Sequence, residues 1–273
     1  MGTLTLRLPD KDRVDLEFFL SDAFTRAMLD RLQRTLVVTA PVWSSRTFVS
    51  PDEGAQRIPI DISGDGALEN AMRVERERIG ALGLGASATL WFEGASDEFD
   101  LQVEMSHDKW KRGGAALANS VSLLVNRSVV EGVDASVWMR GFACTLAAEL
   151  PIEYGFGRTF GEFASTNKTP PNLKGVPSGL DFRKHLPGLY WLNCFGKPQV
   201  ARLGLEQLLS APAHSVEVCS ESVLLSMGDA PWGWEREEYA GKRNACIRHI
   251  GRQFFFDRSI TQDSPPVFGR VQQ

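Results

Sequence analysis

The fold is indicated most clearly by residues 88–105, which read ATLWFEGASDEFDLQVEM. In the second half of this stretch, polar residues alternate with four apolar ones: Phe99, Leu101, Val103 and Met105. An alternation with a period of two is typical of a β-strand with one buried face. The Gly94–Asp97 segment is rich in residues that favour turns. We therefore predict a β-hairpin with arms at Ala88–Phe92 and Phe99–Met105.

The pattern to either side of this hairpin predicts further strands and helices. Apolar residues also alternate in Leu4–Leu8 and Val14–Phe18 around a polar turn, which predicts a first hairpin. Helical periodicity and capping residues predict helices at 24–36, 67–82, 134–146, 198–209 and 235–250. Further strands are predicted at 120–125 and 189–195 and near Val216 and Leu224. The Gly/Pro/Lys-rich segment 157–187 is predicted to be a long loop.

This order of elements favours an α+β fold, with mostly antiparallel sheets and packed helices, because hairpins and helices come in groups and do not alternate strictly. The order strand–strand–helix occurs near the start and again around 86–150, which favours two related halves. We expect one domain over residues 1–273, with a sub-division near 130–155.

Composition and charge narrow the function. The net charge is −4, which argues against a nucleic-acid-binding protein and fits a basic protein partner. The sequence shows neither a signal peptide nor an apolar stretch of 18 residues, so we expect a cytoplasmic protein without a membrane segment. The four cysteines lie far apart in the sequence, and we expect four reduced thiols. Pairing of some of them in an oxidising compartment is the alternative.

A search for catalytic motifs finds none with the right context. Residues 83–88 match G-x-G-x-x-A, but a helix is predicted before them and a strand after, which is the reverse of a dinucleotide site. The four histidines lie far from one another in the sequence, so no local cluster of metal ligands is predicted. We therefore expect no enzyme activity, catalytic residue, metal or cofactor. The alternative is a small metal- or carboxylate-dependent hydrolase that uses His107 and scattered acids.

Acidic and aromatic residues are the candidates for protein binding. The candidates in the 88–105 hairpin are Asp97, Glu98, Asp100 and Glu104, and Asp15 and Glu17 lie similarly on the first predicted hairpin. The others lie in a turn before the last helix: Trp232, Trp234 and Glu235. Tryptophan is enriched at interface hot spots. The alternatives are a solvated strand face for the acids and a lid over the core for the tryptophans.

Residues 187–204 read PGLYWLNCFGKPQVARLG. This stretch resembles the signature P-G-x-Y-W-[LI]-[NT]-x-x-G-x-x-x-[VA]-x-x-[LI]-G of bacterial type VI immunity proteins, among them the fifty-second class of polymorphic-toxin immunity proteins. Within it, Tyr190, Trp191 and Phe195 are expected in the core, and Gly196 is expected to let a strand turn into a helix. Beyond it, Tyr239 and Arg243 in the last helix fit the family's order of elements.

The resemblance implies a dedicated inhibitor of a toxin that is delivered by cell contact. In the fifty-second class the usual partner is a toxin with a restriction-endonuclease-like fold, so a nuclease is implied. We expect tight one-to-one binding that covers the toxin's active site, and a monomer or homodimer when the chain is free. The alternative to an inhibitor is a structural module of the secretion machinery.

Overall fold

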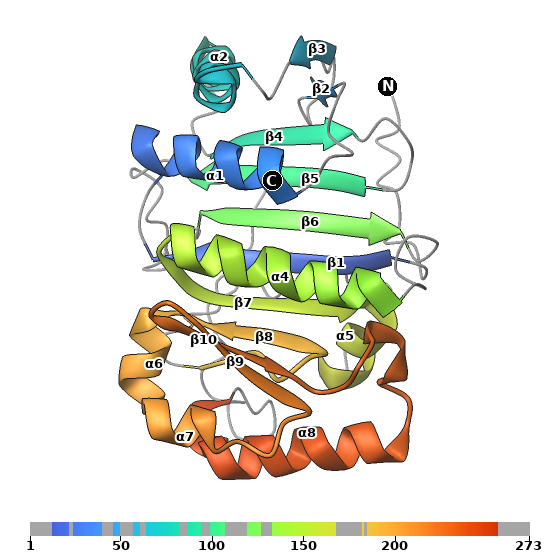
Figure 1. Cartoon of the computed structure of the whole chain (residues 1–273). Coiled ribbons are helices and arrows are strands. Elements are labelled where there is room, and N and C mark those ends of the chain that lie inside the picture. Colours follow the sequence, from blue (N-terminus) through green and yellow to red (C-terminus); the bar gives the residue numbers. More distant parts are fainter. Residues whose placement is uncertain are drawn as a thin grey trace.

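The structure is a computed structural model. It describes residues 13–21, 24–39, 46–49, 57–60, 64–81, 87–93, 99–106, 119–126, 133–167, 182 and 185–255. The described strands join in one ten-stranded sheet of order β3-β2-β4-β5-β6-β1-β7-β8-β10-β9 (Figure 1). Every pairing between these strands is antiparallel. The predicted α+β class with antiparallel sheet is therefore confirmed.

The elements have the following bounds. The strands are β1 (Arg13–Leu20), β2 (Arg46–Val49), β3 (Arg57–Ile60), β4 (Ser87–Glu93), β5 (Phe99–Ser106), β6 (Ser120–Asn126), β7 (Ile152–Thr159), β8 (Leu192–Phe195), β9 (Ser215–Cys219) and β10 (Ser222–Ser226). The helices are α1 (Arg26–Thr39), α2 (Ala67–Ala81), α4 (Val133–Glu149), α5 (Phe160–Asn167), α6 (Lys197–Leu203), α7 (Leu205–Leu209) and α8 (Glu237–Ile250), with short 3-10 turns η1 (Pro231–Gly233) and η2 (Arg252–Phe254).

One predicted hairpin is present and the other is not. β4 and β5 pair as expected, with Leu90 opposite Val103. Of the first predicted hairpin, the arm Leu4–Leu8 lies outside the described residues. The predicted arm Val14–Phe18 is a strand, but the predicted pairing is wrong, because β1 is paired with β6 along one edge and with β7 along the other. Both edges of β1 are therefore occupied by strands that come much later in the chain. Alternation of residue types identifies a strand and its buried face, but it does not identify the neighbouring strands.

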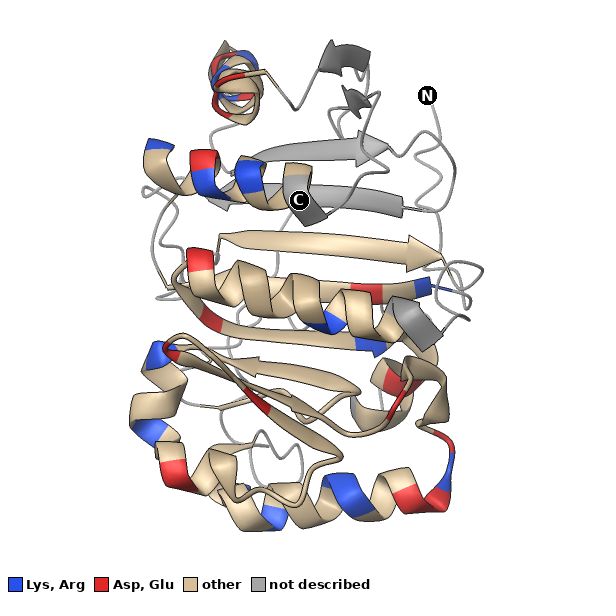
Figure 2. Ribbon diagram, viewed as in Figure 1, with Lys and Arg blue, Asp and Glu red and all other residues tan. Residues whose placement is uncertain are grey.

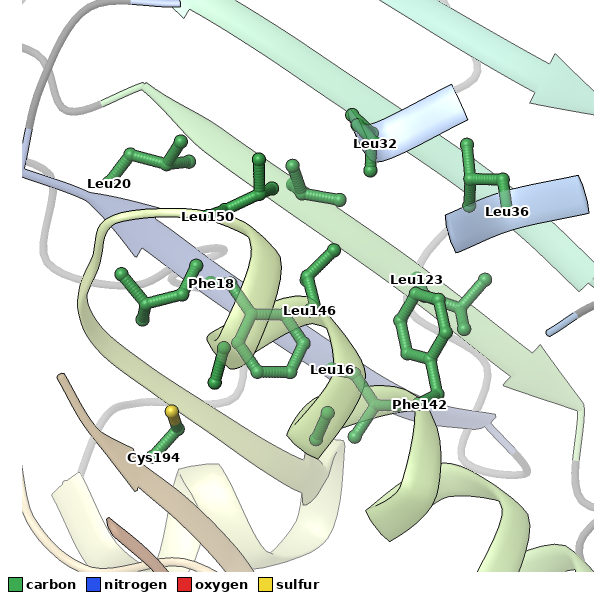
Figure 3. Packing of buried hydrophobic residues seen from close by; sticks show 14 of the residues in the cluster. Leu16, Phe18, Leu20, Leu32, Leu36, Leu123, Phe142, Leu146, Leu150 and Cys194 are labelled. Carbon is green, nitrogen blue, oxygen red and sulfur yellow. The ribbon is translucent and has the colours of Figure 1, made fainter. Parts of the chain in front are cut away.

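Two hydrophobic cores lie on opposite faces of the sheet. The first is formed by α1, α2 and α4 over β1 and β6, with Leu16 and Phe18 against Phe142 and Leu146 (Figure 3). The second is formed by α5, α6, α7 and α8 over β7, β8 and β10, and β1 contributes Phe19 to it. Each fully buried leucine or phenylalanine stabilises the fold by about 1.5–3 kcal/mol. β1 thus contributes side chains to both cores.

The predicted loop 157–187 is partly wrong, because its first residues belong to β7 and α5. β7 contains Gly155 and Gly157, and only the second of these lies in the predicted loop. A Cβ on Gly155 would come within 2.5 Å of Phe18 Cδ1, and one on Gly157 within 2.5 Å of Leu16 Cδ2. The glycines therefore make room for side chains of β1 and do not form a turn.

The 187–204 stretch lies in the core, as predicted. Tyr190, Trp191 and Phe195 are fully buried. The side chain of Asn193 accepts a hydrogen bond from the backbone N–H of Tyr190 and donates one to its carbonyl oxygen. Gly196 precedes α6, and a Cβ there would lie 1.6 Å from the carbonyl oxygen of Ile152. This stretch is therefore a folding element, whose residues are enclosed by the protein.

The cysteines differ from the expectation of four reduced thiols. Cys144 on α4 and Cys219 at the end of β9 form a disulfide, although 75 positions separate them in the sequence. Cys194 and Cys246 are free and buried, as expected. The sheet brings β9 beside α4 by long-range pairing, which the spacing of cysteines in the sequence does not reveal.

Candidate protein-binding site

The acidic residues of the two hairpins that were predicted separately stand on one face of the sheet. Asp100 of β5 pairs with Leu124 of β6, and Leu124 pairs with Asp15 of β1. Residues directly opposite each other in an antiparallel sheet share a face. Glu17 lies two positions beyond Asp15, and Glu104 is linked in the same way through β6 to Phe19 of β1. We call the side that carries Asp15, Glu17, Asp100 and Glu104 the acidic face.

The acidic face lies opposite the first core. Val14 and Leu16 of β1 point to the first core with α1 and α4, so Asp15 and Glu17 between them point the other way. The second core covers this side over β7, β8 and β10, but among the described side chains it contains no residue of β6. On this side β6 carries Ser120, Ser122 and Leu124, of which the two serines are buried.

Arg158 of β7 holds the two carboxylates of β1 at this face. Both β1 and β7 carry basic and acidic residues (Figure 2). Arg158 Nη2 lies 3.1 Å from Asp15 Oδ2 and 3.8 Å from Glu17 Oε2. Its side chain is only 7% exposed, and its guanidinium lies 4.0 Å from the ring centroid of Phe163 on α5. A planar guanidinium suits both kinds of contact. One buried cation therefore fixes the position of two carboxylates.

Burial and the neighbouring arginine act in opposite directions on the ionisation of Asp15. Burial raises the pKa of Asp15, and the nearby Arg158 opposes that rise. When both carboxylates are ionised, the three groups carry a net charge of −1. The backbone register places positions 100 and 104 of β5 on the same side of the sheet.

The two tryptophans of the predicted site pack against the protein itself. Trp232 is half-buried and packs on the first core, and Trp234 is half-buried and packs on the second. A Cβ on Gly161 of α5 would lie 2.7 Å from Trp234 Cζ2, so this ring sits directly on the helix. This placement fits the alternative of a lid over the core. Glu235 is exposed, and its role in toxin binding stays a prediction.

The short helix α5 connects the tryptophan turn to the acidic face. α5 begins directly after β7, and the Thr159 hydroxyl accepts a hydrogen bond from the Glu162 backbone N–H in its first turn. Gly161 contacts Trp234, and Phe163 contacts Arg158. The tryptophan turn and the Arg158 ion cluster are therefore joined through α5, which follows β7 in the chain (Figure 1). Asp97 and Glu98 lie outside the described residues, as does His107.

A buried polar network near this site was not predicted from the sequence. Glu162 is fully buried and accepts a hydrogen bond from the hydroxyl of Tyr239 on α8. Arg243, also on α8, donates a hydrogen bond of 2.7 Å to Thr166 of α5. Burial raises the pKa of Glu162 to about 8, although the bond from Tyr239 and the nearby Arg243 lower it. The network joins α5 to α8 and explains why Tyr239 and Arg243 stand one helical turn apart.

Two further findings concern metal binding and membrane insertion. Among the described residues, no three His, Cys, Asp or Glu side chains gather in a way that could hold a metal ion. No helix in the described part of the chain has the length and apolar character needed to cross a membrane.

Comparison with known proteins finds a similar solved structure but no match to a family model or a curated sequence. The solved structure of a Pseudomonas aeruginosa protein, named T6SS protein PA0821, matches with a TM-score of 0.57 at 14% sequence identity. The match covers 89% of this chain and 73% of that one. The two proteins share a fold. Membership of the fifty-second immunity class stays a prediction.

Proposed function

We propose that the chain is an immunity protein, which binds an effector toxin of a type VI secretion system and neutralises it. The observation that carries the binding role is the acidic face, where the buried Arg158 of β7 holds the carboxylates of Asp15 and Glu17 on β1. The type VI context is supported by the shared fold with a protein named as a T6SS protein and by the resemblance of residues 187–204 to immunity proteins. Fold alone does not give function, so the binding surface needs its own test.

The geometry supports inhibition by docking. Arg158 holds Asp15 and Glu17 in place before any partner arrives, which lowers the entropy lost on binding. The rigid sheet spaces these residues and the register positions Asp100 and Glu104 across neighbouring strands. A toxin with a basic substrate-binding surface would meet complementary charge here, and the bound chain would cover that surface. One chain would bind one toxin.

The test is a double charge reversal, Asp100→Lys with Glu104→Lys, measured against the toxin encoded beside the gene for this chain. We expect weaker binding, with a larger loss at low salt than at high salt, because salt screens interactions between exposed charges. The control is Glu77→Lys with Glu149→Lys, which makes the same change of charge on exposed residues of α2 and α4, on the side of the first core. If both double variants show the same affinity and salt dependence, the acidic face is not the binding surface.

A structural module of the secretion machinery is the second candidate, because the name of the structural neighbour refers to the secretion system and to no toxin. Such a module would assemble with itself and would not protect cells. Size-exclusion chromatography and co-expression with the toxin separate the two. Death of cells that contain abundant folded chain would overturn the immunity role.

The class of toxin that the chain can neutralise depends on the cellular compartment in which the two proteins meet. The resemblance implies a nuclease that is met in the cytoplasm, and a surface that binds nucleic acid would supply basic charge. The Cys144–Cys219 disulfide bears on this choice, because disulfides depend on the redox state of the compartment.

A further inference from the structure

One edge of the sheet is open at β9. This strand is the last one and, within the described chain, it pairs with β10 alone (Figure 1). The loop between the two strands is two residues long, so Cys219 and Ser222 form the hydrogen-bonded pair that closes the hairpin. Hydrogen-bonded and non-hydrogen-bonded pairs alternate along an antiparallel ladder. The backbone N–H and C=O groups of Val216 and Val218 therefore point away from β10, to the outer edge.

These outward backbone groups are free to bind another strand. No residue that the structure describes forms a hydrogen bond with them. Natural sheets protect such an edge with proline and basic residues, as at the other end of this sheet, where β3 carries Arg57 and Pro59. β9 reads SVEVC and contains neither kind of residue. It is therefore an unprotected edge, and its Val218 side chain is 59% exposed.

Apolar side chains surround this edge on one face of the sheet. Val216 packs on the second core, so Val218, two positions further along, lies on the same face. The helix α7 also covers this core and contacts β9. Its Leu205 and Leu209 are exposed and, four positions apart, lie on one side of the helix. Exposed apolar side chains therefore lie on two neighbouring elements at the open edge.

The other face of β9 carries an ion pair. Arg140 of α4 lies 3.7 Å from the partly exposed Glu217 carboxylate and donates a hydrogen bond of 3.3 Å to Ser215. Both contacts use Nη1, and a guanidinium has five N–H donors, so donors remain for a second carboxylate. The disulfide between Cys219 and Cys144 fixes β9 to the same helix. The edge is therefore held in position before a partner binds, which lowers the entropy lost on binding.

We propose that a second copy of this chain occupies the open edge, and that the β9 strands of the two copies pair antiparallel around a two-fold axis. Val216 of each copy then stands opposite Val218 of the other, and each pair exchanges both backbone hydrogen bonds. Such an axis runs perpendicular to the sheet, so the apolar face of one copy continues into the apolar face of the other. The two sheets become one.

The charges of β9 fit a second copy. In this register Glu217 stands opposite Glu217 of the other copy, and like charges directly opposite each other destabilise a strand pair. Each carboxylate, however, brings Arg140 of its own chain beside it, so the charges cancel across the axis. The same edge meets itself with valine against valine and with a balanced set of charges, which is what a two-fold contact between identical chains requires.

The dimer does not depend on the proposed function and is compatible with it. A two-fold contact uses the same edge of both copies, so it closes at two copies and does not continue into a filament. β9 and the strand β5, which carries Asp100 and Glu104, are separated by β6, β1, β7, β8 and β10. Pairing at β9 therefore leaves the β5 side of the acidic face of both copies open.

The first experiment is sedimentation velocity of the full chain between about 1 µM and about 300 µM. We expect the sedimentation coefficient to rise from that of a monomer to that of a dimer. Val218→Lys places a charge at the edge and should weaken the association about tenfold or more. The control is Val37→Lys on α1, a valine that is also exposed, at 42%, and lies outside β9 and α7. A wild type that stays monomeric, or equal association of the two variants, would overturn the proposal.

The second experiment measures amide hydrogen exchange by NMR and identifies the pairing itself. The amides of Val216 and Val218 should exchange about tenfold or more slowly at the high concentration than at the low one, whereas that of Glu217, which bonds to β10, should be slow at both. Val218→Pro removes one outward N–H and leaves the ladder to β10 intact, so it should abolish the dependence on concentration at Val216. Exchange at Val216 and Val218 that is independent of concentration would overturn pairing through β9, even in a chain that forms dimers.

Discussion

Replacement of Glu162 by glutamine should flatten the dependence of folding stability on pH. The carboxyl group is fully buried, and its pKa rises from 4.5 to about 8 on folding. Between these values the folded chain keeps a proton that the unfolded chain has lost. Stability therefore falls as pH rises from about 4.5 to 8, by about 1.4 kcal/mol per pH unit, and is level outside this window. The whole window corresponds to roughly 5 kcal/mol.

The variant Glu162→Gln keeps an oxygen that accepts the hydrogen bond from Tyr239, but it has no proton to lose. Urea unfolding followed by tryptophan fluorescence at pH 5.5 and pH 8 gives the free energy of unfolding. We expect the wild type to lose about 3 kcal/mol more than the variant between these two pH values. Glu77→Gln, at an exposed position on α2, should behave as the wild type. Equal losses in Glu162→Gln and wild type would show that Glu162 is ionised in the folded chain.

The remaining predictions concern a glycine and the disulfide. Gly196→Ala would place Cβ 1.6 Å from the Ile152 carbonyl oxygen, so we expect a loss of roughly 4 kcal/mol or more in unfolding experiments. Gly141→Ala, whose Cβ would meet nothing within 4 Å in α4, should stabilise by about 0.5–1 kcal/mol, and equal melting temperatures of the two variants would contradict this account. Cys144→Ala with Cys219→Ala removes a bond between residues 75 positions apart, for which loop entropy gives about 4–5 kcal/mol. Reductant should lower the stability of the wild type towards that of this double variant, and a wild type insensitive to reductant would contradict the role of the bond.

Elements that are determined by local periodicity were predictable from the sequence. The hairpin of β4 and β5 and the helices α1, α2 and α8 lie within a few residues of their predicted bounds. β7 was missed because Gly155 and Gly157 make room for Phe18 and Leu16, two side chains that are far away in the sequence. A glycine that accommodates a distant side chain looks, in the sequence, like a glycine in a loop.

Part of the candidate site could be predicted, and its assembly could not. Alternation placed Asp100 and Glu104 on the polar side of one strand and Asp15 on the polar side of another. Only the pairing of both strands with β6 shows that these sides are the same face. Nothing in the sequence indicated that Arg158 would join them, because this residue fell in the predicted loop.

The position of β1 has a consequence for how the chain acquires its structure. β1 comes early in the described chain, yet its two partners are β6 (Ser120–Asn126) and β7 (Ile152–Thr159). Both edges of β1 therefore stay open during synthesis until most of the first 160 residues have left the ribosome. Pairing over such distances in the sequence is slow, because the chain loses the entropy of a long loop before the stabilising contacts form. A chain that stays unfolded for this long is exposed to aggregation and suited to capture by chaperones before its sheet closes.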